Sequence, residues 1–128
     1  MEIATGNFAN VKKYRAAGYN TVSIALSARY YSGERMVELA PKRVWINEPE
    51  NIYTPIYKRE ILSKLNAREV YNKLKILFSD KKVVLLCHEK EGDFCHRRIV
   101  AKWLQDELGI EVPELGRMRQ KDIFANLV

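Results

Sequence analysis

The chain has 128 residues, of which 47% are apolar and 30% charged, with a formal net charge of +6. This composition excludes disordered, collagen-like and low-complexity chains, and the length predicts one domain spanning residues 1–128. The longest unbroken apolar run, 83–87, is much shorter than a transmembrane helix or the core of a signal peptide. We therefore expect a cytoplasmic protein that does not bind membranes.

Positive charge is concentrated outside the C-terminal third of the chain. Residues 1–86 carry a net charge of +7, whereas residues 87–128 carry −1. The basic residues occur singly or in pairs, and a nucleic-acid interface requires them to cluster on one face of the fold. The two cysteines are too few for a disulfide-dense scaffold, and without an export signal we expect both to be reduced thiols.

Strand and helix patterns alternate along the first half of the chain. We expect strands at residues 2–5, 21–26 and 43–46. A helix is expected at 8–17, because Gly18 is typical of the residue that follows a helix. Residues 27–41 combine glycine, proline and charged residues, a composition that indicates a long loop.

The second half of the chain has stronger signals. Thr54 followed by Pro55 predicts the start of one helix, and Asn66 predicts the start of another, which buries Val70, Leu74, Leu77 and Phe78. We expect a buried strand at 82–87, a helix at 95–108 that ends at Gly109, a short edge strand at 112–113 and a helix at 118–127. This alternation predicts an α/β fold: an open, mostly parallel sheet of about four strands flanked by helices, in a Rossmann-like arrangement of three layers.

Reactive and charged side chains gather where the strand at 82–87 passes to the next helix. Cys87, His88 and Glu89 follow the strand, and in open α/β sheets ligands bind beyond the carboxyl ends of the strands. The helix that begins near Cys95 directs its positive end to the same place, and its first turn contains His96, Arg97 and Arg98 as donors. The pattern predicts an anion pocket in which a cysteine would favour its thiolate form.

Several specific chemistries are excluded by spacing. No arginine lies six positions after Cys87, as a phosphatase loop would need, and the two cysteines do not form a CxxC redox motif. Cys87, His88, Cys95 and His96 match no common zinc spacing, so we expect neither a metal nor another cofactor. Each of these residues also has an ordinary structural role open to it, such as packing or capping.

The segment LLCHEKEGDFCHRRIVAKWL resembles the hallmark of the YeaO-like family, domain of unknown function 488 (DUF488). Four other segments match that family in order: TGNFANVKKY, SIALSARYYSG, LAPKRVW and IYKREIL, the last with the pair Tyr53 and Tyr57 at the start of its helix. The resemblance covers nearly the whole chain. It implies a small α/β domain and leaves the biochemistry open.

The resemblance also implies a set of site residues. The family pattern falls on Cys87, Glu89, Cys95, His96 and Arg97. It further includes Thr5, Asn7, Ser27 and Arg29 as ligand-binding positions. Tyr53 and Tyr57 can stack on a ligand ring, or they can pack beside the sheet.

Three functions are compatible with these residues. The first is an enzyme, a hydrolase or transferase on a phosphate-like or nucleotide-like anion. Arg97 and Arg29 would hold this small anionic ligand, Glu89 would act as acid, base or nucleophile, and Cys87 or Cys95 would supply a thiolate, with His96 beside them.

The second function is a nucleic-acid-binding module that uses the basic residues of 1–86, with Tyr30, Tyr31, Tyr53 and Tyr57 as stacking platforms. The third is a thiol redox or metal module built on Cys87 and Cys95. The chain is expected to be a monomer or a homodimer, with the apolar segment 123–128 as a dimer contact.

Overall fold

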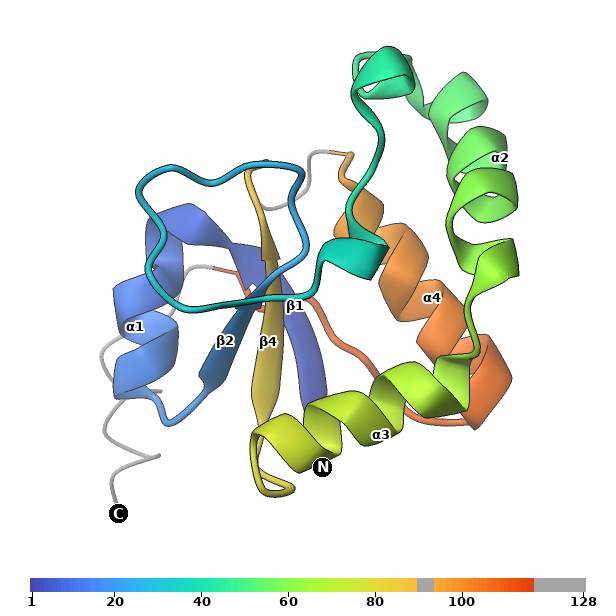
Figure 1. The fold of residues 1–128 in the computed structure, drawn as a ribbon. Helices are drawn as coiled ribbons and strands as arrows, with labels where there is room; N and C mark the ends of the chain where they lie inside the picture. Colours follow the sequence, from blue (N-terminus) through green and yellow to red (C-terminus); the bar gives the residue numbers. More distant parts are fainter. Residues whose placement is uncertain (90–93, 117–128) are drawn as a thin grey trace.

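The fold is a parallel β-sheet covered by helices on both faces, and the computed structural model describes residues 1–89 and 94–116 of it (Figure 1). The four strands are all parallel and lie in the order β1-β4-β2-β3. Their bounds are β1 Ile3–Asn7, β2 Asn20–Ser23, β3 Glu34–Arg35 and β4 Val83–Cys87. The predicted fold class is confirmed.

Strand β4 lies between β1 and β2, and every one of its residues is buried. This position explains its unbroken apolar run, because a central parallel strand is covered on both faces. The register aligns Asn7 of β1 and Ser23 of β2 with Cys87 and Leu86 of β4, respectively. The carboxyl ends of three strands therefore meet at one edge of the sheet.

The two faces of the sheet have separate cores, as the alternation of side chains along a strand requires. Val83 and Leu85 pack in the larger core, under α2 (Glu50–Glu60), α3 (Ala67–Leu77) and α4 (His96–Leu108). Val84 and Leu86 face the opposite side and contact Tyr14 of α1 (Val11–Ala16). Figure 1 shows the resulting three layers, with α1 on one side of the sheet and α3 and α4 on the other.

Several predicted ends of helices are confirmed. The Asn66 side chain accepts a hydrogen bond from the backbone N–H of Glu69 at 3.0 Å and caps α3. Gly109 has φ 67°, a left-handed conformation that suits glycine, and ends α4. Val70 and Leu74 are buried as expected and Phe78 is partly buried against the same core, but Leu77, the last residue of α3, is exposed.

Two predicted elements are wrong. Residues 43–46 were expected to be a strand, but Arg43–Trp45 form a 3-10 turn whose Trp45 is buried against Tyr53. Helix α2 begins at Glu50, so Pro55 lies inside it rather than at its first position. Pro55 and Asn51 are both exposed, and water can therefore bind the Asn51 carbonyl that proline leaves without its helical partner.

The loops differ from the prediction in smaller ways. Strand β2 ends at Ser23, three residues before the predicted end, and the long loop that follows contains the short strand β3. Residues 112–113 do not form a strand: the Pro113 carbonyl accepts from the Thr5 N–H at 2.9 Å, beside a single bridge between Thr5 and Glu114. The predicted helix at 118–127 and the apolar segment 123–128 lie outside the described residues.

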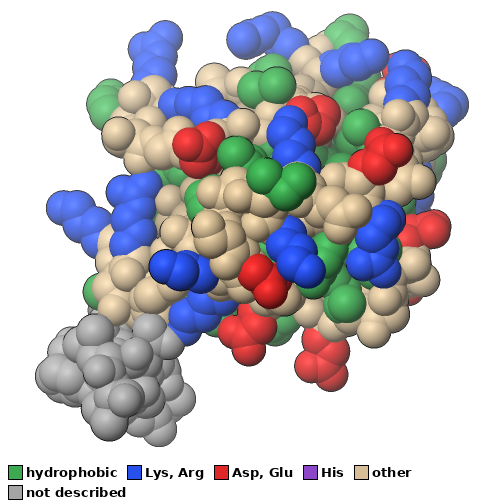
Figure 2. Space-filling view, turned by 60° about the horizontal axis from the view of Figure 1, so that its bottom comes forward, with side chains coloured by type: hydrophobic (Ala, Val, Ile, Leu, Met, Phe, Trp, Pro, Cys, Tyr) green, Lys and Arg blue, Asp and Glu red, His purple; other side chains and the backbone are tan. Residues whose placement is uncertain are grey.

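Basic residues are distributed over the surface with acidic residues among them. Figure 2 shows one face of the molecule, on which Lys and Arg side chains alternate with Asp and Glu. Exposed ion pairs such as Lys73–Glu38 and Lys102–Asp106 contribute to this mixture. In the part of the chain that the structure describes, no helix is long and apolar enough to cross a membrane.

Candidate functional site: a buried cysteine pair at the end of the central strand

Cys87 and Cys95 lie together at the carboxyl end of β4. Cys87 is the last residue of the strand, and Cys95 is the N-cap residue of α4. The structure joins them in a disulfide bond, both side chains are buried, and Ala25 and Phe8 pack against them. The cysteines were expected to be reduced thiols, but the structure has them joined, because the end of β4 and the start of α4 bring the two sulfurs together.

Arg97 points into the protein and not toward solvent. Its side chain is fully buried, and its Nε and Nη2 donate to the Glu114 carboxylate at 2.9 and 3.0 Å. Its Nη1 donates to Cys87 Sγ at 3.1 Å and to the Glu89 carbonyl at 3.0 Å. Arg97 was expected to hold an anionic ligand, but Glu114 already occupies Nε and Nη2, the two parallel donors with which an arginine binds an anion in bidentate fashion.

Glu114 is a site residue that sequence reasoning missed. Burial raises the pKa of its carboxyl, but hydrogen bonds from Arg97 and Thr5 outweigh burial and hold that pKa below its usual value. The Thr5 hydroxyl donates to Glu114 Oε1 at 2.8 Å and accepts from Arg98 Nη1 at the same distance. No local pattern marks Glu114, since its partners lie 17 and 109 positions away along the chain.

His96 is held in one tautomer by the carbonyl of Ile24. The ring Nε2 lies 2.6 Å from that carbonyl oxygen, which can only accept, so Nε2 carries the proton. Nδ1 is then an unprotonated acceptor, 3.7 Å from Cys95 Sγ. Burial, reinforced by the charge of nearby Arg97, lowers the pKa of His96 to about 4, although the hydrogen bond to Ile24 opposes this shift. The ring is neutral at pH 7.

A small cavity of about 120 Å³ lies beside the cysteine pair. Its lining includes both cysteines, His96, His88 and the exposed residue Glu89. The charged side chains among its described lining residues are acidic, namely Glu48 and Glu89. His88 is exposed, and its Nε2 contacts the Ser27 carbonyl.

The remaining predicted ligand residues are divided between structural positions and the surface. Thr5 is fully buried in the hydrogen-bonded group around Glu114. Asn7 caps the 3-10 turn Phe8–Asn10 through its side-chain oxygen, which accepts from the Asn10 N–H at 3.2 Å. Ser27 contacts His88 through its carbonyl, and Arg29 is exposed on the loop after Ala28.

Tyr53 and Tyr57 pack on each other inside the protein. Their rings are nearly parallel with centroids 6.0 Å apart, and the Tyr57 hydroxyl donates to the Leu39 carbonyl at 2.6 Å. Tyr57 is fully buried, and burial raises its pKa well above the ordinary value. The packing role holds for Tyr57, and Tyr53 borders the small cavity. Neither ring is exposed, so these two cannot serve as stacking platforms for nucleic acid; Tyr30 is fully exposed.

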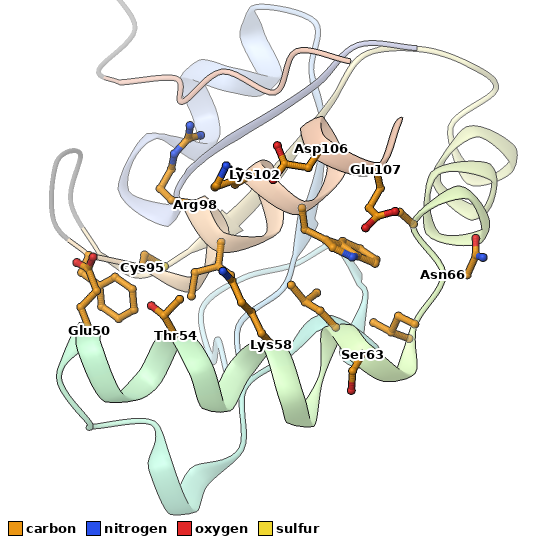
Figure 3. Close-up of a pocket in the computed structure, with 16 residues that line it drawn as sticks. Glu50, Thr54, Lys58, Ser63, Asn66, Cys95, Arg98, Lys102, Asp106 and Glu107 are labelled. Carbon is orange, nitrogen blue, oxygen red and sulfur yellow. Dashed lines mark ion pairs between the residues drawn. The ribbon is translucent and has the colours of Figure 1, made fainter. Parts of the chain in front are cut away.

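A larger groove of about 810 Å³ runs between α2 and α4. Figure 3 shows Thr54 and Lys58 of α2 facing Arg98 and Lys102 of α4 across it. Phe94 and Cys95 line both the groove and the small cavity, so the segment that carries Cys95 separates the two hollows.

The fold and the site define an α/β domain whose central strand and following helix hold a buried cysteine pair, an arginine and a histidine. A family model described as "Active DUF488-N3 subclade" matches residues 11–108. The chain therefore belongs to the DUF488 family, as its LLC-x-E and CHR elements indicated. No curated protein and no solved structure matches the chain.

Proposed function

We propose that the protein is a thiol-dependent redox enzyme in which Cys87 and Cys95 alternate between a dithiol and a disulfide. The observation that carries this proposal is the joined sulfur pair with Arg97 on one sulfur and His96 on the other. The word "active" in the description of the family model agrees with a catalytic role. This is the third of the functions that the sequence allowed, and it uses the contacts of Arg97 with Cys87 and of His96 with Cys95.

Each partner has a chemical task in the oxidation step. The guanidinium of Arg97 stabilises the thiolate of Cys87, which attacks one oxygen of a hydroperoxide and breaks its O–O bond. Cys87 becomes a sulfenic acid, and the leaving hydroxide or alkoxide takes up a proton from solvent, which replaces the one that Cys87 released, and departs as water or alcohol. The Cys95 thiol, which lies beside the acceptor Nδ1 of His96, then attacks the Cys87 sulfur and breaks its S–O bond, and the hydroxide leaves as water with the proton of that thiol.

In one cycle, two electrons pass from the dithiol to the hydroperoxide. Two equivalents of a low-molecular-weight thiol return them by successive exchange, first to a mixed disulfide and then to the free dithiol. A cavity of about 120 Å³ has room for about four water molecules, so it admits small reactants. The space that the described residues line therefore suits a hydroperoxide as the oxidant.

Thiol counting tests the proposal directly, because the chain has only two cysteines. We expect two thiols in the reduced protein, none after one equivalent of hydrogen peroxide, and a mass lower by two hydrogens. Cys87→Ser and Cys95→Ser should each fail to form the intramolecular bond, whereas His88→Gln, which also borders the cavity, should cycle normally. Two thiols that persist in the folded wild type after oxidation would refute the proposal.

A hydrolase or transferase on a small nucleotide-like anion is the second candidate. It is favoured by the position of the cavity, beyond the carboxyl end of β4 and at the N-terminus of α4, where backbone N–H groups attract anions. Glu89 would be its acid or base, and Arg97 would act through its hydrogen bonds to Cys87 and the Glu89 carbonyl.

Calorimetric titration of the reduced protein with inorganic phosphate and with a nucleoside monophosphate tests this candidate. Binding that is changed by Glu89→Gln but not by the exposed control Glu111→Gln would support it. No heat of binding with either ligand would exclude it, with no consequence for the thiol chemistry.

A further inference from the structure

Three buried side chains with metal-binding atoms converge at the end of β4. The sulfur atoms of Cys87 and Cys95 and a ring nitrogen of His96 all lie within 4.8 Å of one another. All three residues are nearly inaccessible to solvent. Two thiolates and an imidazole are ligands that Zn²⁺ prefers, and they occur together in catalytic zinc sites that keep one position open.

The orientation of His96 is the arrangement that metal-binding histidines need. A ligating histidine normally donates its second N–H to a carbonyl or carboxylate, which fixes the ring and directs the other nitrogen to the metal. Here Nε2 donates to the Ile24 carbonyl, and the lone pair of Nδ1 lies on the side of Cys95 Sγ. Neither atom of this hydrogen bond belongs to a cysteine.

The distances agree with a shared ion. With Zn–S and Zn–N bonds of about 2.3 and 2.05 Å and tetrahedral angles, a sulfur and a nitrogen ligand are about 3.6 Å apart. Cys95 Sγ and His96 Nδ1 are 3.7 Å apart. The Cα atoms of Cys87 and Cys95 are 7.2 Å apart, which leaves room for rotation of the side chains to place an ion between the reduced sulfurs.

From this geometry we propose that the reduced protein binds one Zn²⁺ ion through Cys87, Cys95 and His96. The buried site then carries no net charge, because the ion neutralises the two thiolates and Glu114 neutralises Arg97. All three ligands line the small cavity, so the fourth position of the tetrahedron can open toward Glu89 and solvent. The C-H-x6-C-H spacing of Cys87, His88, Cys95 and His96 hid this site, because His88 contacts the Ser27 carbonyl instead and the described residues then offer three ligands, Cys87, Cys95 and His96.

Metal binding and disulfide formation exclude each other, because the disulfide uses both thiolates. A hydroperoxide that oxidises the zinc-bound pair takes two electrons from the sulfurs, which form the disulfide and release Zn²⁺. With two protons from solvent, hydrogen peroxide becomes two molecules of water, and an organic hydroperoxide becomes one alcohol and one water. This release rests on the proposed thiol chemistry. The binding of zinc to the reduced protein does not.

The test uses the full chain, reduced and freed of metal. Its affinity for Zn²⁺ is measured by competition with a chromophoric chelator. We expect one equivalent to bind, and Co²⁺ in its place to show thiolate charge-transfer absorption and the intense visible bands of a tetrahedral site. Cys87→Ser, Cys95→Ser and His96→Gln should each weaken zinc binding by at least tenfold. The matched control His88→Gln should bind as the wild type does.

Circular dichroism and thermal melts establish that each variant is folded. If His96→Gln does not fold, Cys95→Ser, which preserves side-chain size, provides the ligand variant that is compared with the wild type. A folded, fully reduced wild type that binds no zinc would overturn the inference, as would unchanged affinity in the three ligand variants. The proposed redox function is read separately, from the thiol count after peroxide in the presence of chelator. A protein that cycles but binds no metal therefore retains the first proposal and loses the second.

Discussion

At the scale of single residues, the ion pair between Arg97 and Glu114 organises the site. Arg97 is completely buried, and its guanidinium connects Glu114, Cys87 Sγ and the Glu89 carbonyl. A buried guanidinium is tolerated only when a carboxylate compensates its charge and acceptors satisfy its N–H groups. Glu114 is therefore as necessary to the position of Cys87 as Arg97 itself.

Glu114→Gln should lower the free energy of unfolding at pH 7 by about 3 kcal/mol, because it leaves a buried cation without its counter-charge. Chemical denaturation monitored by tryptophan fluorescence measures this change. The control Glu111→Gln removes an exposed carboxylate three positions earlier and should change stability by less than about 0.5 kcal/mol. Equal effects of the two variants would contradict the assigned role of the pair.

The same carboxylate should contribute to acid sensitivity. The pKa of Glu114 is lower in the folded protein than its usual 4.5, so the unfolded chain binds the proton more readily. Its stabilising contribution is therefore present above about pH 4.5 and is lost as the pH falls through the folded pKa. The stability difference between wild type and Glu114→Gln, measured by urea denaturation from pH 7 to pH 3, should shrink below pH 4.5. A difference that stays constant would count against this linkage.

At the scale of elements, some helices are positioned by local signals and others by tertiary packing. The cap of α3 is local: Asn66 bonds to the N–H of Glu69 and needs no other element. The position of α2 is not set by a local signal. Its N-cap residue, Pro49, makes no side-chain hydrogen bond to the helix, and the helix continues through Pro55. Tyr53 and Tyr57, both buried on one side of α2, stabilise the helix by packing and outweigh the break that proline would otherwise cause.

Asn66→Ala should destabilise the protein by about 1 kcal/mol, the usual value of an N-cap hydrogen bond. Thermal unfolding followed by circular dichroism measures it as a lower melting temperature. Asn51→Ala is the matched control. Asn51 is an exposed asparagine in the first turn of α2, and it is not the N-cap residue of that helix, which is Pro49. A loss as large for Asn51→Ala as for Asn66→Ala would show that the cap is not the cause.

At the scale of the whole molecule, β4 connects the two cores and the site. Its odd and even residues pack on opposite faces of the sheet, and its last residue is Cys87. A cavity in either core should therefore affect the entire domain. The cysteine pair is held by the same strand, so its geometry depends on global packing.

Leu85→Ala should lower the free energy of unfolding by about 3 kcal/mol, because it removes a fully buried side chain from the larger core. Ile76→Ala, a change of similar size on the exposed side of α3, should have a small effect. Denaturant titration of both variants gives the comparison. A cost below 1 kcal/mol for Leu85→Ala would mean that β4 is not the central strand.

The sequence by itself determined the fold class, the central strand, the start of α3, the bounds of α4 to within a residue and the membership of the DUF488 family. Those features are encoded locally, in an apolar run, in capping residues and in a contiguous motif of cysteine, histidine and arginine. Only the tertiary structure decided that Arg97 faces Glu114, that His96 donates to Ile24, and that the two cysteines touch. The residues in these three contacts are 17, 72 and 8 positions apart along the chain. The directions in which their side chains point depend on which of them the fold buries, and no local pattern specifies that.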